Sequence, residues 1–273
     1  METPVPSLRF FHTLRRLVTS ISTVSSRTLK IRNEGTRLGM DAPSLPTCLG
    51  FIMDGNRRFA KAQHLPAIEG HRQGFERVFV ESVEYFRDVG TRHLVYFAFS
   101  TENWQRQESE VTYLLTLFKR AMAELEKKFL NDPVLEKRLR VRFVGRREDF
   151  SLELQNSMNM LEEKSVSYGK GTTIWIALSY GGRAEIVAAV NAAVAKGETI
   201  DEQTFGALLW SAELPEPDMI VRTSGEQRLS NFLTWKSVYS ELYFIKKPWP
   251  ALTKIDFEDI LKEYGKRQRR LGK

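Results

Sequence analysis

The 273-residue sequence lacks the residues and runs on which several classes of protein depend. Cys48 is the only cysteine, so no intramolecular disulfide can form, and we expect a reducing compartment such as the cytoplasm. Four scattered histidines and one cysteine give no ligand spacing for a structural zinc site. No segment approaches the ~18 consecutive apolar residues that a membrane-spanning helix needs.

Two nucleotide-binding signatures are also missing. The sequence contains neither G-x-x-x-x-G-K-[ST] nor G-x-G-x-x-G. The first absence disfavours ATP or GTP hydrolysis, and the second leaves a dinucleotide-binding fold without its fingerprint. Hydrophobic residues nevertheless make up 42% of the chain, enough for the core of one large α/β domain or two small ones.

The net charge of +7 is concentrated at the two ends of the chain. Residues 1–39 carry seven Lys/Arg and two Glu, and residues 261–273 carry six Lys/Arg and one Glu. The remaining residues, 40–260, carry 28 Lys/Arg against 31 acids. A nucleic-acid-binding protein would spread positive charge over its folded body, so we expect no nucleic-acid partner.

The first 33 residues differ from the rest in composition. They contain ten Ser/Thr, six Arg/Lys and one acid, with apolar residues near helical spacing. This composition fits a disordered or accessory extension (or an upstream start before Met40), a membrane-surface helix, or a cleaved organelle-targeting peptide, in that order of preference. We therefore divide the chain into an extension, 1–39, and a folded domain, 40–273.

From Cys48 onward, predicted strands and helices alternate. This order predicts an α/β fold, a single domain with a six-stranded, mostly parallel sheet surrounded by helices. The predicted strands are 48–54, 93–100, 139–145, 172–182, 218–225 and 241–245, and the main predicted helices are 75–90, 110–130, 151–165, 183–197, 201–210 and a last helix from 256.

Four of these strands end in clusters of glycine, hydroxyl and arginine residues. In a parallel sheet such ends meet at one edge, where ligands bind. Arginine forks match phosphate oxygens, and glycines let backbone amides approach an anion. The pattern predicts a polyphosphate site, ringed by Arg58, Arg106, Arg183, Arg222 and Arg228.

Taken one at a time, these motifs also have structural explanations. DGNRR at 54–58 fits a capped turn, and FSTENW at 99–104 fits a helix cap with a packed tryptophan. Their expected meeting at one sheet edge favours a site. Asp54 is then the natural Mg²⁺ ligand, because Mg²⁺ prefers few carboxylates plus substrate phosphates and water. Glu241 is a second candidate ligand, although its position alone favours a surface or edge-strand charge.

The motifs, in this order, resemble those of the cis-prenyltransferases, the family of undecaprenyl and dehydrodolichyl diphosphate synthases. The resemblance covers nearly everything from Leu49 to Gly272. The matching segments are FIMDGNRRFAK, EGH, YFAFSTENWQR, VRFVG, SYGGR, IVRTSGEQRLSNFLTW, ELYF and RRLG.

This resemblance implies a Mg²⁺-dependent enzyme that adds isopentenyl diphosphate units, in cis, to an allylic diphosphate such as farnesyl diphosphate. The product would be a polyprenyl diphosphate for a glycan carrier lipid. It further implies an apolar tunnel beside the sheet for the growing chain. The resemblance implies a homodimer or a heteromer, and we favour the homodimer because one chain holds every motif. Peripheral contact with a membrane is a further expectation, from the basic terminal segment.

Roles follow from the resemblance position by position. Asp54 would coordinate Mg²⁺ and assist ionisation of the allylic diphosphate, while Ser100 and Asn103 would lie near the condensing carbons and help a diphosphate oxygen to take the proton. Glu241 would reach the metal across the dimer. The implied substrate-binding residues are Gly55, Asn56, Arg57, Arg58, Phe59, His71, Trp104, Arg106, Arg222, Arg228, Ser230, Arg270 and Gly272.

The sequence departs from the family in ways that leave open questions. Arg146 follows Gly145 where Asp is usual, and Ala67 stands where many relatives have an arginine. Leu114, Phe118 and Met122 fit a core as well as a tunnel wall.

The sequence also leaves two rival functions open. One is an inert partner subunit of a heteromeric synthase, which the retained Asp54 and arginines disfavour. The other is an RNA- or lipid-binding module.

Overall fold

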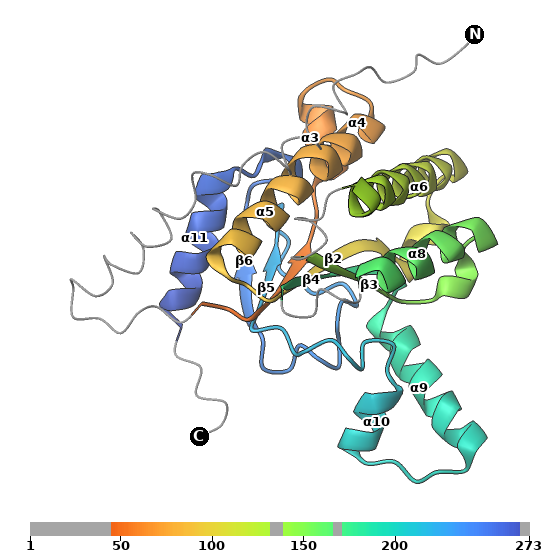
Figure 1. Ribbon diagram of the computed structural model, residues 1–273. Helices are drawn as coiled ribbons and strands as arrows, with labels where there is room; N and C mark the ends of the chain where they lie inside the picture. Colours follow the sequence, from red (N-terminus) through yellow and green to blue (C-terminus); the bar gives the residue numbers. More distant parts are fainter. Residues whose placement is uncertain (1–44, 132–138, 166–170, 268–273) are drawn as a thin grey trace.

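The computed structural model describes residues 45–131, 139–165 and 171–267, so the predicted extension and the terminal Arg270 and Gly272 lie outside the described residues. Within them, all six predicted strands are present (Figure 1). Their bounds are β1 (Cys48–Ile52), β2 (His93–Ser100), β3 (Leu139–Val144), β4 (Thr172–Tyr180), β5 (Met219–Arg222) and β6 (Glu241–Phe244).

The strands form one sheet in the order β3-β4-β2-β1-β5-β6, and every pairing between them is parallel. Ile52 at the end of β1 pairs with Phe97 of β2 and Arg222 of β5. The loops that follow β1, β2, β4 and β5 therefore open at the same edge. This confirms the predicted fold class.

Helices fill the connections between the strands. The predicted helix 75–90 is present as a π-helix, η1 (Gly74–Phe79), that continues into α5 (Val80–Val89), whereas α4 (Ala67–Gln73), which runs directly into η1, was not predicted from the sequence. The helices are α3 (Asn56–Ala62), α4 (Ala67–Gln73), η1 (Gly74–Phe79), α5 (Val80–Val89), α6 (Glu108–Asn131), α8 (Leu152–Ser165), α9 (Gly182–Lys196), α10 (Glu202–Leu208) and α11 (Lys254–Gly265), with the 3-10 helices η2 (Thr101–Gln105), η3 (Arg147–Asp149) and η5 (Trp249–Ala251). No helix among the described residues is long and apolar enough to span a membrane.

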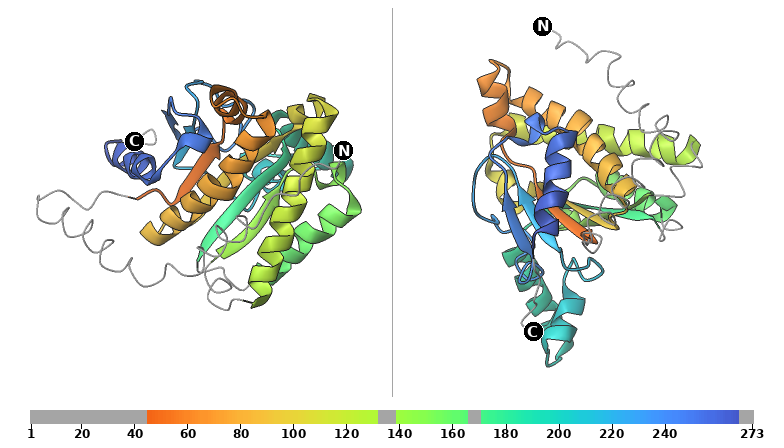
Figure 2. Two further views of the ribbon diagram at one scale, coloured as in Figure 1. Left: turned by 90° about the horizontal axis from the view of Figure 1, so that it is seen from above. Right: turned by 90° about the vertical axis from the view of Figure 1, so that its left-hand side faces the viewer.

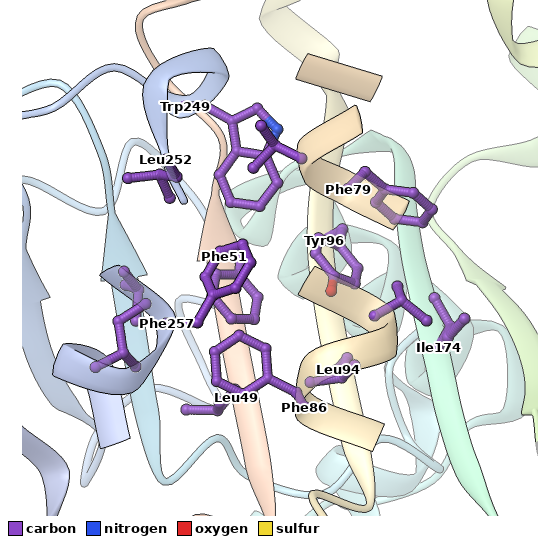
Figure 3. Close-up of a cluster of buried hydrophobic side chains, with 14 of the residues drawn as sticks. Leu49, Phe51, Phe79, Phe86, Leu94, Tyr96, Ile174, Trp249, Leu252 and Phe257 are labelled. Atoms are coloured by element: carbon purple, nitrogen blue, oxygen red, sulfur yellow. The ribbon is translucent and has the colours of Figure 1, made fainter. Parts of the chain in front are cut away.

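The two faces of the sheet are covered differently. Side chains of η1, α5 and α11 pack on one face with Phe51 of β1 and Tyr96 of β2 (Figure 3), and α6 and α8 extend this layer over β3 and β4. The opposite face packs against Leu214, Phe232 and Leu233, which belong to connecting segments. The helices α9 and α10 lie at the end of the molecule remote from α3 and α4 (Figure 2).

Two glycines, four residues apart, allow α4 and η1 to lie against the loop that follows β1. A Cβ atom at Gly70 would overlap the carbonyl oxygen of Asn56, and one at Gly74 would overlap the Asn56 side chain and Trp249. The Trp249 indole N–H donates to the Gly74 carbonyl at 2.9 Å. These contacts fix the position of α4, which carries His71, beside the edge of the sheet.

Gly70→Ala should therefore destabilise the protein by roughly 2–3 kcal/mol, because the backbone oxygen of Asn56 cannot move away cheaply. Gly206→Ala in α10 is the matched control. Nothing lies within 4 Å of a Cβ there, and alanine should stabilise that helix by about 0.5–1 kcal/mol. Urea unfolding of both variants measures the difference. Equal stabilities would show that α4 does not depend on this close approach.

Candidate active site

The loop after β1 places Asp54 at the sheet edge and turns sharply into α3. Gly55 has a backbone φ of +95°, which residues other than glycine rarely adopt. A Cβ atom there would overlap Ser224 and Pro248. Its N–H donates to Asp54 Oδ1 at 2.6 Å. The Asn56 side chain donates to the Met53 carbonyl at 2.8 Å and closes the turn. The DGN motif thus builds a rigid corner whose carboxylate keeps a fixed direction.

Asp54 is held by positive charge from the end of β5 and from α3. Arg222 Nη2 donates to Asp54 Oδ2 at 2.9 Å, and Arg58 Nη2 lies 3.5 Å from the same oxygen. Burial, the largest single influence, raises the pKa of Asp54, but the Arg222 hydrogen bond and charge, with Gly55 and Arg58, outweigh it. The net effect is a lowered pKa, so Asp54 is an anion at neutral pH.

Arg222 is the buried centre of the site. Only 4% of the residue is exposed, and its Nη1 donates to Ser230 Oγ at 2.7 Å and to the Arg228 carbonyl at 2.5 Å. One guanidinium thus joins the end of β5 to the loop 228–231 and to Asp54. Its Nε is buried with no hydrogen-bond partner in the structure.

Two further arginines are joined by an acid that sequence reasoning did not single out. Glu226 contacts Arg58 Nη1 at 3.2 Å and Arg228 Nη1 at 2.6 Å. Arg58 also donates to the Ser224 carbonyl at 3.2 Å. Both arginine side chains are more than half exposed, so an anion from solvent can reach them.

The turn after β2 carries the two residues expected near the reacting carbons. Asn103 Oδ1 accepts from the Ser100 backbone N–H at 3.0 Å, and the Ser100 side chain accepts from the backbone N–H of Asn103 in return. This reciprocal cap holds η2 in one conformation. Both side chains line the cavity described below.

A second missed acid, Glu110, gathers three predicted binding residues. Its carboxylate lies 2.8 Å from Arg106 Nη1, 3.3 Å from His71 Nε2 and 3.8 Å from Arg57 Nη1. Burial, followed by the Arg106 charge, lowers the pKa of His71 to about 4, against the opposing pull of Glu110. His71 is therefore a neutral imidazole at pH 7. The i,i+4 spacing of Arg106 and Glu110 was the sequence signal for this cluster.

The neutral state of His71 predicts a pH dependence of stability. Its folded pKa lies below the ordinary value of 6.5, so the stabilising effect is complete above pH 6.5 and is lost as the pH falls toward 4. Between pH 7 and 5 the wild type should lose roughly 1–2 kcal/mol more of its free energy of unfolding than His71→Gln. Urea titrations at several pH values measure this, and parallel curves for the two proteins would contradict it.

The charged residues open onto a cavity with an apolar interior. Its polar lining comes from the loops after strands and from α3 and α4, whereas its apolar lining comes mainly from η1, α6, β2 and β4. The lining residues are Ile52, Met53, Asp54, Asn56, His71, Gly74, Phe75, Phe79, Phe97, Ala98, Ser100, Asn103, Arg106, Leu114, Leu117, Phe118, Ala121, Met122, Ile176, Leu178, Arg222 and Trp249. Leu114, Phe118 and Met122 are thus both core and cavity wall.

Some predicted residues lie beside the cavity or away from it. Trp104 packs on Phe99, behind the cavity-lining turn, and Phe59 is half-buried in α3 without lining the cavity. Of the five arginines predicted to ring one cleft, Arg106 and Arg222 line this cavity, and Arg183 lines a separate hollow with Ser230. Glu241 pairs with Met219 in the sheet register, three residues before Arg222.

The position of Glu241 separates it from Asp54 within one chain. It begins β6, at the opposite sheet edge from the strand ends, and lies 3.8 Å from Arg267. Among the described residues no group of three or more His, Cys, Asp or Glu gathers for a metal. A single carboxylate still fits Mg²⁺ bound largely through substrate phosphates and water. Asp54 meets this requirement, because its side chain is 30% exposed and borders the cavity.

A half-buried carboxylate among arginines, at the mouth of an apolar cavity, suits a ligand that joins a polyphosphate head to an apolar chain. The family described as "Putative undecaprenyl diphosphate synthase" matches residues 52–272. The chain therefore belongs to that family and is a prenyltransferase, which elongates prenyl chains.

Individual relatives agree with this assignment. The isoprenyl transferase of Thermotoga maritima is 44% identical over 233 residues, 84% of this chain and 97% of that protein. That of Chromobacterium violaceum is 41% identical over 229 residues, 84% of this chain and 88% of that protein.

Two solved structures share the fold. Lavandulyl diphosphate synthase from Lavandula x intermedia, in complex with dimethylallyl diphosphate, has a TM-score of 0.75 and 29% identity. A "probable undecaprenyl diphosphate synthase" from Campylobacter jejuni has a TM-score of 0.69 and 29% identity. Each match covers 84% of this chain and 99% of the other.

Proposed function

We propose that the chain is a Mg²⁺-dependent polyprenyl diphosphate synthase. It adds isopentenyl diphosphate in the cis configuration to an allylic primer, farnesyl diphosphate, and its product becomes a glycan carrier lipid. The single observation that carries this is the cavity itself: Asp54, His71 and Arg222 stand at its polar end, and aromatic and aliphatic side chains line the remainder. A diphosphate with a long apolar tail matches both parts.

The residues at the polar end divide the work between two diphosphates. Arg58 and the start of α3, with Gly55 and Asn56, hold the allylic diphosphate beside Asp54. Arg228 and Ser230, fixed by the buried Arg222, hold isopentenyl diphosphate. Negative charge that develops on the departing diphosphate then meets guanidinium groups already in place, which lowers the barrier without reorganisation.

Asp54 is the residue that would hold Mg²⁺. Bound there, the ion would neutralise charge on the departing diphosphate. Ser100 and Asn103 border the reaction space and orient the isopentenyl group so that its proton leaves toward a diphosphate oxygen. The neutral His71 contributes a hydrogen-bonding group and adds no charge at pH 7.

The apolar lining provides the space for the growing chain. Phe75, Phe79, Leu117 and Ala121 line it together with Leu114, Phe118 and Met122. A prenyl chain that enters between α6 and the sheet would be shielded from water, as a tunnel beside the sheet requires.

A homodimer completes the site in this proposal. Two exposed apolar groups support it: Val187, Val190 and Val194 follow one stripe of α9, and Val238, Tyr239 and Leu242 lie on and beside the edge strand β6. Exposed apolar clusters of this kind commonly mark interfaces. The partner's terminal segment, with Arg270 and Gly272, and Glu241 would reach the neighbouring site.

We place the enzyme in the cytoplasm, in peripheral contact with a membrane. The basic ends, 1–39 and 261–273, support this because clustered Lys/Arg residues attract anionic lipid. Organelle targeting by residues 1–33 is the alternative. Imaging of the full chain and of a chain beginning at Met40 separates the two.

The deciding experiment incubates the purified protein with labelled isopentenyl diphosphate, farnesyl diphosphate and Mg²⁺. Butanol-extractable product, absent when EDTA is added, is the expected result, and chromatography gives its length. The bond configuration follows from NMR of the product. No product from the pure protein, restored by a second cellular protein, would favour the inert-subunit reading instead.

A further inference from the structure

Trp104 is the anchor of the turn that carries Ser100 and Asn103. It lies in η2, directly after Asn103, and its ring packs edge-on against Phe99 with centroids 5.0 Å apart and tilted against Phe150 at 5.5 Å. Its indole N–H donates to Ser179 Oγ at 2.8 Å. The orientation of η2 therefore depends on a hydroxyl that comes from a different strand.

Ser179 occupies an unusual position at the end of β4. It is fully buried, and its φ of +45° lies in the left-handed region that few side chains adopt. Its hydroxyl also contacts Asp149 Oδ2 within hydrogen-bond distance. A hydroxyl has one proton, and a carboxylate can only accept. The Ser179 proton therefore points to Asp149, and its lone pair is left for the Trp104 N–H.

Asp149 is in turn fixed by Arg146. Arg146 Nη2 lies 3.1 Å from Asp149 Oδ1, and the Arg146 backbone N–H donates to the Ser179 carbonyl at 3.2 Å. A Cβ at Gly145 would overlap the Leu178 carbonyl oxygen, so the loop after β3 needs glycine to lie this close to β4. This ion pair gives Arg146, the residue that departs from the family pattern, a structural partner.

We propose that Ser179 is a positioning residue for prenyl transfer. The row Arg146, Asp149, Ser179 and Trp104 connects the segments that follow β3 and β2 through the end of β4. It sets the direction in which Ser100 and Asn103 face the cavity. The inference rests on the proposed role of those two residues at the condensing carbons.

A comparison within the chain separates positioning from ordinary burial. Ser165 is also fully buried, and its hydroxyl accepts from the Val141 N–H at 3.0 Å, but it joins α8 to β3 and lines no part of the cavity. Ser179→Ala and Ser165→Ala thus remove the same atom from equally buried sites. Ser179→Gly removes the hydroxyl without a penalty at positive φ.

The kinetic test is a double-mutant cycle. Ser179→Ala and Ser179→Gly should each lower kcat roughly tenfold, with KM for isopentenyl diphosphate within about twofold of wild type, since only orientation is lost. Ser165→Ala should leave kcat within about twofold of wild type, because Ser165 does not hold the turn that carries Ser100 and Asn103. The Trp104→Phe variant lacks the indole N–H. In this background, adding Ser179→Ala should lower kcat by less than about a further twofold.

Rescue and a spectroscopic signature complete the test. Asp149→Asn, which keeps an acceptor, should retain more kcat than Asp149→Ala. The Trp104 indole ¹H–¹⁵N resonance, assigned by its loss in Trp104→Phe, should move upfield in Ser179→Ala and not in Ser165→Ala.

Several results would overturn the inference. They are unchanged kcat in both Ser179 variants of an active enzyme, effects that multiply fully in the Trp104→Phe background, or an unmoved indole resonance. A wild type that forms no product at all would instead contradict the proposed function, and the indole resonance would still report on the contact.

Discussion

Asp54→Asn should lower kcat by about 10³-fold. Asparagine keeps an oxygen that can accept the Gly55 N–H, so the corner that carries the side chain stays folded. It loses the negative charge that pairs with Arg222 and that would hold Mg²⁺ in the proposed function. The loss should therefore appear in turnover, measured by steady-state incorporation of labelled isopentenyl diphosphate at saturating Mg²⁺.

The control for this change is Asp259→Asn on the surface of α11, where the carboxylate pairs only with Lys262 among the interactions described. It should match the wild type in kcat. If Asp54→Asn retained more than about a tenth of wild-type turnover, the carboxylate would not be the metal ligand, and the assignment of Mg²⁺ to this corner would fall.

The same substitution changes the pH dependence of stability. Because the folded pKa of Asp54 is lowered, its contribution is present above the unfolded value and is lost as the pH falls through the folded one. Asp54→Asn should therefore flatten the acid side of the stability profile. A steeper acid loss in the variant would show that the arginines do not stabilise the ionised carboxylate.

The sheet and its functional edge could be predicted from the sequence because their signals are local. Short apolar runs define buried strands, and strand–helix alternation implies parallel pairing. Once the strands are parallel, Asp54, Ser100 and Arg222 must lie at the same edge, and the observed order β2-β1-β5 makes them neighbours. Their presence around one cavity follows from topology alone.

The pairings of charge at the site could not be predicted in the same way. Glu226 joins Arg58 to Arg228, and the first of these contacts links α3 to the loop after β5, 168 residues apart in sequence. Glu110 gathers His71 from α4 in the same manner. Such contacts depend on how far side chains reach after the loops have packed, which no local pattern encodes.

Two details of backbone geometry escaped prediction for a related reason. The register of β6 with β5 pairs Glu241 with Met219, at the start of both strands, and the sequence pattern of β6 does not specify this register. The positive φ of Ser179 has no sequence signal, because serine is not a residue that ordinarily marks the left-handed region. In both cases tertiary packing determines the backbone geometry.

Arg222→Met should cost both stability and turnover, because this guanidinium is the buried centre of the site. Methionine keeps an unbranched side chain but removes the donors to Asp54, Ser230 and the Arg228 carbonyl. The Asp54 carboxylate would then lack its buried guanidinium partner, which should lower the free energy of unfolding by about 3 kcal/mol. Arg87→Met, which breaks a pair with Asp88 at 2.8 Å in α5, is the control for turnover and should leave kcat unchanged.

The kinetic and energetic consequences of Arg222→Met can be separated by a second substitution. With Asp54→Asn also present, no uncompensated carboxylate remains, so the double variant should be more stable than the sum of the single losses predicts, by about 1 kcal/mol or more. Turnover should not recover, because both diphosphates still lack their buried positive charge, and kcat/KM for isopentenyl diphosphate should stay down by about 10³-fold. Urea unfolding and initial rates on the same four proteins test both parts. Strictly additive stabilities would mean that Arg222 supports the loop through Ser230 and Arg228 alone, and that its contact with Asp54 contributes nothing to the fold.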